Sequence, residues 1–177
     1  MLKKILNSTL QFSVLAFFLL INANLSFAQQ EDVDSDDAPP PLIKLSKTES
    51  EQLKSESDFK QRTTLCLQIA ANYLQRAESS TSAADFQEAL NDLGGYQASI
   101  ENGLNFLQSH NNDNRKIRDN LRRLEMALRA QTPRLETIRR STPAEYGAHL
   151  KSILNFTRKA RTLALDAFFS DTVLPNN

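Results

Sequence analysis

Four arginines at helical spacing are the residues of this sequence whose types and positions could do chemistry. Arg115, Arg118, Arg122 and Arg129 lie within the stretch RKIRDNLRRLEMALRA. At about 100° per residue they fall on one side of a helix, away from the leucines between them. Arginine offers a planar cation that binds carboxylates and phosphates through paired hydrogen bonds. The row is therefore our candidate anion-binding site, and its plain alternative is a solvated helix face.

The charge of the chain is divided between its two halves. Residues 48–114 hold ten acidic and four basic residues, whereas residues 115–177 hold six acidic and 13 basic residues. A second basic group, Lys116, Arg123 and Arg134, lies on a flank of the helix that carries the row. We expect this flank group to pair with the acidic half of the chain, which leaves the row available to an external anion.

Residue types suited to catalysis or metal binding are few and do not converge. The two histidines are His110, in a predicted loop, and His149, with Glu145 one helical turn before it. Metal sites in helical bundles use several inward-facing glutamates and histidines, so we predict that His149 pairs with Glu145 and binds no metal. Cys66 is the only cysteine, and we expect it to be a small buried side chain rather than a reactive thiol. We therefore predict no catalytic, cofactor-binding or metal-binding residues.

Four helical runs must position these residues. In each run apolar residues recur at steps of three and four, the period of an amphipathic helix, and no stretch alternates like a strand. The first run is expected to start at Ser46, in a capping box with Glu49, and to continue to about Ser79. The second run extends from about Ala83 to Gln108.

Glycine and proline interrupt two of the runs. Gly94 and Gly95 lie inside the second run, and we expect a bend or soft joint there because Gly95 points away from the apolar seam. The third run follows a loop at residues 109–114 and contains Pro133. Proline removes one backbone hydrogen bond and disfavours helix at the residue before it, so we expect a kink or a restart.

The fourth run has the clearest start signal, the sequence STPAE. It predicts Thr142 as N-cap, Pro143 at the first helical position and Glu145 completing a capping box. The run ends at about Phe169. The predicted buried faces comprise Phe59, Cys66, Ile69, Ala70, Tyr73 and Ala77; Phe86, Leu90, Leu93, Gln97, Ile100, Leu104 and Leu107; Ile117, Leu121, Leu124, Leu128, Gln131, Leu135 and Ile138; and Tyr146, Leu150, Ile153, Thr157, Ala160, Ala164 and Phe168.

These runs predict an all-α fold. Runs of about 25–30 residues give helices roughly 40 Å long. Long helices with short joints favour antiparallel neighbours, hence an up-down bundle of four long helices over residues 46–171. Residues 172–177 are expected to form a flexible tail.

The N-terminus is typical of a secretory signal peptide. Lys3 and Lys4 precede an apolar run of about ten residues, which is too short to span a bilayer, and small residues stand at the end of residues 1–28. We predict cleavage after Ala28, no membrane anchor in the mature chain, and a periplasmic or secreted protein. Residues 29–45 are acidic and rich in proline, which predicts a disordered linker.

Three hypotheses for function follow. The first is an exported, non-enzymatic helical bundle that acts as a scaffold or interaction module of the cell envelope. The second is an anion- or ligand-binding bundle that uses the arginine row. An enzyme is the third and least supported, since no catalytic set of residue types converges. The partner is unknown: another envelope protein or an anionic surface fits, and export disfavours nucleic acid.

Overall fold

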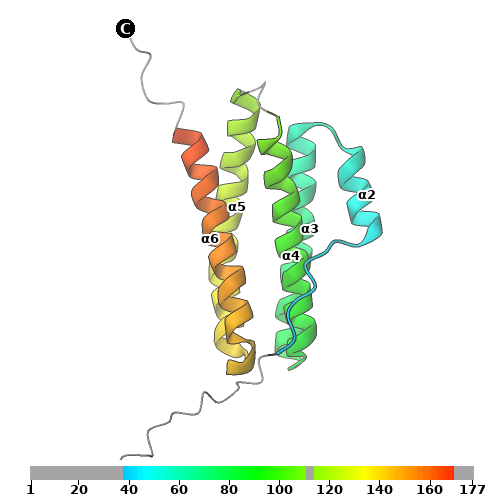
Figure 1. Ribbon diagram of the computed structural model, residues 1–177, viewed down its shortest axis with the longest axis vertical. Helices are drawn as coiled ribbons and strands as arrows, with labels where there is room; N and C mark the ends of the chain where they lie inside the picture. The colour runs from blue at the N-terminus through cyan, green and yellow to red at the C-terminus, as the bar shows by residue number, and fades with distance from the viewer. Residues whose placement is uncertain (1–37, 111–113, 170–177) are drawn as a thin grey trace, which may run out of the picture. The chain divides into compact units, whose positions relative to one another are not determined.

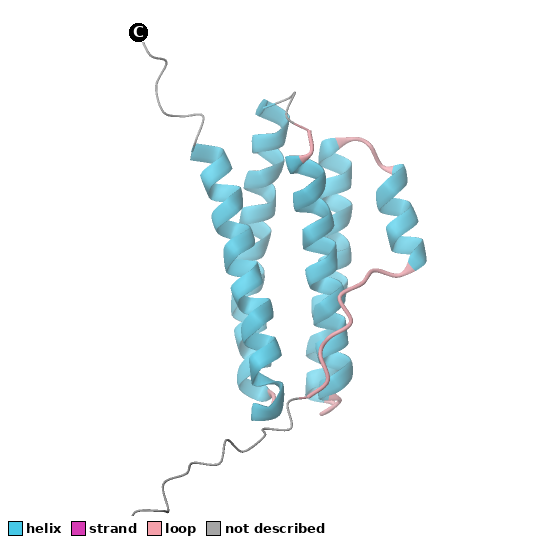
Figure 2. Cartoon of the chain, in the orientation of Figure 1, coloured by secondary structure: helices cyan, strands magenta, loops and turns pink. Residues whose placement is uncertain are grey.

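The computed structural model describes residues 38–110 and 114–169, and over these residues the protein is entirely helical. The predictions for the signal peptide, for residues 29–37 and for the C-terminal tail lie outside this part of the chain. The helices, drawn in Figures 1 and 2, are α2 (Lys47–Ser55), α3 (Phe59–Ser82), α4 (Phe86–Gln108), α5 (Asn114–Ser141), the 3₁₀ turn η2 (Ala144–Tyr146) and α6 (Gly147–Phe169). Within the described residues, none of these helices has the length and apolar character needed to cross a bilayer.

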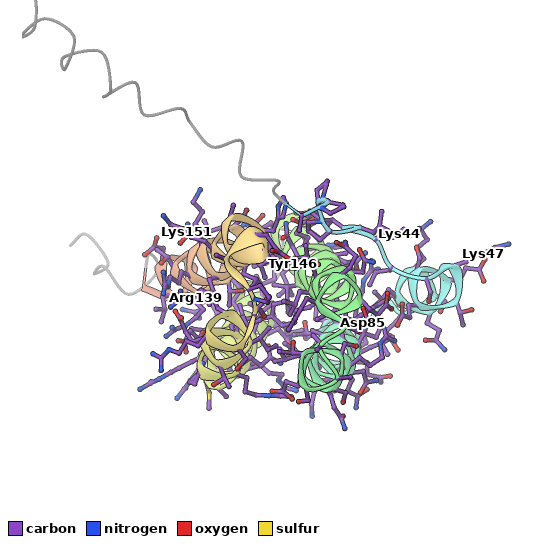
Figure 3. The ribbon with its side chains drawn as sticks, turned by 90° about the horizontal axis from the view of Figure 1, so that it is seen from below. Lys44, Lys47, Asp85, Arg139, Tyr146 and Lys151 are labelled. Atoms are coloured by element: carbon purple, nitrogen blue, oxygen red, sulfur yellow. The ribbon has the colours of Figure 1, made fainter. Side chains whose placement is uncertain are left out.

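The four long helices pack side by side as two hairpins. One hairpin is α3 with α4 and the other is α5 with α6; α3 lies beside α5, and α4 lies beside α6, as the end-on view in Figure 3 shows. The all-α prediction is confirmed. Consecutive helices are the closest neighbours in both hairpins, but α4 and α5 occupy diagonal corners. The five residues between them can span about 17 Å, enough for the diagonal of a square of helices roughly 10 Å apart.

The first predicted run is two helices rather than one. The prediction of a continuous helix from Ser46 to Ser79 is wrong at residues 56–58, because Asp58 caps a new helix. Its Oδ1 accepts the backbone N–H of Gln61 at 2.9 Å. Such short polar side chains compete with the helix for backbone groups. The predicted capping box at the start of α2 is confirmed, and α2 packs against α3.

The predicted apolar faces form the core. The core includes Leu93 and Ile100 of α4 and Leu124 and Leu128 of α5, all fully buried. Cys66 is also fully buried, as expected. Phe59, Phe86, Gln97, Ile117 and Tyr146 are half-buried at the rims of these faces.

Gly94 and Gly95 are sites of close contact within an uninterrupted α4. A Cβ at Gly95 would lie 2.2 Å from the ring of Tyr73, and one at Gly94 would lie 2.5 Å from the carbonyl oxygen of Leu42. We expected a bend because Gly95 lies off the apolar seam, but close packing against Tyr73 explains this glycine instead. Both glycines let another part of the chain approach the helix backbone.

Pro133 does not divide α5, which is continuous from Asn114 to Ser141. The predicted restart is wrong. Pro133 is on the exposed side of α5, and the buried Leu128 and Leu135 on the opposite face hold the helix across one missing hydrogen bond.

The start of α6 also differs from the prediction. The hydroxyl of Thr142 donates to the carbonyl oxygen of Ile138 at 2.7 Å, back into α5, and does not act as an N-cap. A 3₁₀ turn, η2, follows Pro143 without a side-chain cap, and α6 begins at Gly147. A threonine hydroxyl at such a junction can cap the following helix or donate to a carbonyl oxygen of the preceding helix, and Thr142 does the latter.

Residues 38–45, the described part of the predicted linker, lie against the bundle rather than apart from it. The backbone N–H of Ala38 donates to the carbonyl oxygen of Glu145 at 3.1 Å. Nε2 of His149 donates to the carbonyl oxygen of Ala38 at 2.7 Å. This segment continues along α4 (Figure 1), where Leu42 meets Gly94.

Candidate anion-binding surface

The arginine row lies along the outer side of α5. Arg115, Arg122 and Arg129 are exposed, as expected, whereas Arg118 is half-buried. The leucines of the same helix point into the core, so the helical phase deduced from the sequence is correct. Because α5 is continuous, Arg115 and Arg129 are separated by about 21 Å along one rigid helix.

Other arginines of α5 and α6 hold helices together. Arg134 donates from Nε and Nη2 to the two carboxylate oxygens of Glu78 on α3, both at 2.6 Å. This pair confirms, for Arg134 alone, the predicted pairing of the flank group with the acidic half of the chain. Arg123, another member of that group, donates instead to the hydroxyl of Thr64 on α3 at 3.3 Å.

Ion pairs between arginine and glutamate also join α5 and α6. Arg161 of α6 contacts Glu125 of α5 at 3.1 Å, and Arg158 of α6 contacts Glu136 at 2.8 Å. Glu136 also pairs with Arg139 at 3.0 Å, and these arginines lower the pKa of Glu136. Carboxylates that face the α5–α6 seam are therefore already engaged by cations.

The outer row differs from these interfacial arginines. Among the residues that the structure describes, Arg115, Arg118 and Arg129 make no hydrogen bond or ion pair. Their guanidinium groups keep their charge at any physiological pH and have five N–H donors each. They can therefore bind an incoming anion without breaking an existing pair.

Two further residues belong to this face, and the sequence analysis missed them. Met126 stands between Arg122 and Arg129 with 59% of its surface exposed, and Arg140 is exposed beyond Pro133. Counting the helical phase of the row past Pro133 places Arg140 in line with Arg122. Because the sequence predicts a break at Pro133, Arg140 was not assigned to the row.

The electrostatic field around the bundle is one-sided. Residues 114–169 contain 13 basic and five acidic residues, a net charge of +8, whereas residues 38–110 contain six basic and nine acidic residues, a net charge of −3. The α5–α6 hairpin is thus the cationic half of the bundle. Such a field raises the local concentration of anions and speeds their association.

Another polar cluster, a candidate for chemistry on its own, joins α2, α3 and α4. The hydroxyl of Tyr73 donates to Glu49 at 2.8 Å, the guanidinium of Arg76 stacks 4.2 Å from the Tyr73 ring, and Arg76 donates twice to Asp92 at 2.8 and 2.6 Å. Burial raises the pKa of Asp92, and Arg76 offsets only part of this effect. Burial also acts on Glu49, but hydrogen bonds from Ser46 and Tyr73 outweigh it and lower its pKa. Each group satisfies the next, so we interpret the cluster as a connection between helices.

The remaining reactive side chains are also engaged in structure. Burial raises the pKa of the Cys66 thiol to about 11, despite the nearby Arg62, so at neutral pH it is a thiol rather than a nucleophilic thiolate. The predicted partner of His149 is wrong: its hydrogen bond goes to the carbonyl oxygen of Ala38 and not to Glu145. Over residues 38–110 and 114–169, no three side chains of His, Cys, Asp or Glu converge on a common point.

No protein-family model, curated protein or solved structure matches this chain. The function is therefore inferred from the geometry of α5 and its surroundings.

Proposed function

We propose that the protein is a non-enzymatic interaction module of the cell envelope, exported by its N-terminal segment, which holds an anionic partner on the outer face of α5. One observation carries this proposal. Three arginines at the helix interfaces, Arg134, Arg158 and Arg161, are matched with carboxylates. On the outer face, Arg115, Arg118 and Arg129 have no such partner in the described part of the chain.

Affinity would come from the number of contacts. A single exposed ion pair contributes less than about 1 kcal/mol. A row of four arginines on a rigid helix adds several such contacts without the cost of ordering a loop. Because the contacts are exposed, salt screens them over about 10 Å at 0.1 M, and the binding must weaken as salt rises.

The test compares two variants that lose the same charge. In the row variant, all four arginines of the row become glutamine. The control variant carries Lys47→Gln, Lys54→Gln, Lys151→Gln and Lys159→Gln, all at exposed positions. We expect wild type and control to bind an acidic polymer or anionic vesicles at low salt, and the row variant to lose binding while it melts like wild type. Equal losses in both variants would mean that net charge alone acts, and no binding by wild type would refute the proposal.

A further inference from the structure

A groove between α3 and α5 lies next to the arginine row. Its volume is about 870 Å³, within the range of roughly 300–1,000 Å³ that is usual for binding pockets. Phe59 and Leu65 of α3, both half-buried, line it together with Lys116 and Arg123 of α5. The groove therefore offers apolar surface on one wall and cations on the other.

Asn120 of α5 also lines this groove and has an unsatisfied acceptor. The residue is 4% exposed, and its Nδ2 donates to the carbonyl oxygen of Lys116 at 2.8 Å. Its Oδ1 is buried and has no hydrogen-bond partner among the described residues. A buried acceptor without a partner costs about 1–3 kcal/mol. The oxygen has no exposed surface in this structure, so the side chain of Asn120 would have to turn toward the groove for a ligand N–H to reach it; that hydrogen bond would remove the cost.

Three carboxylates, Glu56, Asp58 and Asp119, also line the groove. Glu56 accepts the backbone N–H of Asp58 at 2.9 Å, and Asp58 accepts that of Gln61 at 2.9 Å. Asp58 is the N-cap of α3, where the helix dipole balances part of its negative charge, whereas Glu56 is the C-cap of α2. The third carboxylate, Asp119, belongs to α5 itself. Lys60, Lys116 and Arg123 match the three carboxylates of the lining in number, so the excess of positive charge next to the groove comes from the adjacent row.

We propose that the anionic partner is an acidic polypeptide segment that lies extended in the groove between α3 and α5. Its backbone N–H would reach Oδ1 of Asn120, and its carboxylates would face Arg123 and the adjacent row. Apolar parts of its side chains would cover Phe59 and Leu65. A membrane surface, by contrast, would touch only the convex row and not enter the groove. This inference rests on the proposed function and names the partner class for the same surface.

The acidic residues of this chain's own N-terminal region are poorly placed to occupy the groove. Ala38 is bound at the start of α6, whereas Asn120 is 21 residues from the end of α5 at Ser141, about 31 Å along the helix axis. The first acidic residue of this region, Glu31, is seven residues before Ala38, so a fully extended chain carries it about 25 Å at most. The partner is therefore a segment of another molecule.

The test uses a fluorescein-labelled oligoglutamate and vesicles of phosphatidylglycerol, each titrated at low salt. Arg123→Gln and Asn120→Leu alter the groove without touching the row, and Lys151→Gln on α6 is the matched control. We expect each groove variant to bind oligoglutamate about tenfold more weakly, the size expected when a hydrogen bond to a charged or buried group is lost. The control should bind oligoglutamate like wild type. We also expect oligoglutamate to raise the melting temperature of wild type more than that of Asn120→Leu, a variant that removes a buried unsatisfied acceptor and should fold.

The outcomes separate the two proposals. If the row variant loses oligoglutamate binding while both groove variants bind like wild type, the groove inference is wrong and the proposed function stands. If wild type binds vesicles but not oligoglutamate, the partner is a lipid surface and the inference is again overturned. If wild type binds neither probe, both proposals fail.

Discussion

Replacing Gly95 by alanine tests whether the contact between α4 and Tyr73 is as close as the structure indicates. The added Cβ would stand 2.2–2.5 Å from three ring atoms of Tyr73. Ordinary contact between such atoms needs more than 3.4 Å. The ring must therefore move by about 1 Å, and the hydrogen bond from its hydroxyl to Glu49 and the stacking of Arg76 move with it.

The expected cost follows from opposing effects. Alanine is better than glycine in a helix interior by about 1 kcal/mol, which favours the variant. Overpacking a core typically costs about 1–3 kcal/mol, and loss of a hydrogen bond to a charged group costs about 1.5–3 kcal/mol. We expect Gly95→Ala to lower the free energy of unfolding by about 2–4 kcal/mol. Gly147→Ala is the matched control: beyond its own turn of helix, no atom lies within 4 Å of its added Cβ, and its stability should be unchanged or higher by up to about 1 kcal/mol.

The free energy of unfolding of both variants is measured by urea titration, with circular dichroism as the signal. An unchanged dependence of this free energy on urea concentration shows that the folded and unfolded states remain comparable. A double variant with Tyr73→Leu removes the ring that the new methyl group meets. The two substitutions should therefore be strongly non-additive, with Gly95→Ala costing much less in the leucine background. If Gly95→Ala is as stable as wild type, the close contact and our account of this glycine pair are wrong.

Three further predictions follow from burial, charge and the N-terminal sequence. Leu124→Ala should lower the free energy of unfolding by about 2–5 kcal/mol because Leu124 is fully buried, whereas Met126→Ala on the exposed side of α5 should lower it far less. If urea unfolding ranks the two variants the other way, the assignment of the buried side of α5 is wrong. The folded-state pKa of Glu49 lies below its ordinary 4.5. The stability that this carboxylate contributes is therefore present above about pH 4.5 and lost as pH falls through its lower folded pKa, so wild type and Glu49→Gln should differ in stability near neutral pH and converge in acid. Mass spectrometry of exported protein should find an N-terminus at Gln29, and full-length chain in the membrane fraction would contradict it.

Local periodicity was enough to predict that the chain is helical and which side of each long helix is buried. Leu93 and Ile100 in α4, and Leu124 and Leu128 in α5, repeat at steps that allow no other element, so their burial follows from spacing alone. The break at residues 56–58 was missed because a short polar stretch is equally compatible with the outer face of one long helix. Only the capping bond made by Asp58 distinguishes the two.

Contacts between residues far apart in the sequence could not be predicted in the same way. Gly95 has a role because Tyr73, in another helix, lies against it, and nothing near Gly95 in the sequence signals this contact. His149 bonds to Ala38, which is 111 residues away, in preference to the glutamate one turn before it. For the candidate site, the side of α5 that carries the row could be predicted, but the adjacent groove is formed jointly with α3 and exists only in the folded bundle.

The spacing of the row itself bears on the choice between a binding surface and a solvated face. Arg115, Arg118 and Arg122 follow one another at steps of three and four, where like charges on a helix repel by about 0.2–0.5 kcal/mol per pair. A face that serves only solubility is more stable when acids and bases alternate at these steps. The same helix has such an arrangement further along, where Glu136 and Arg139 pair at 3.0 Å. Asp119 and Glu125, at steps of three and four from members of the row, relieve part of this repulsion within the chain. An external anion placed between Arg115 and Arg118 would reduce the remaining repulsion, which favours the binding interpretation.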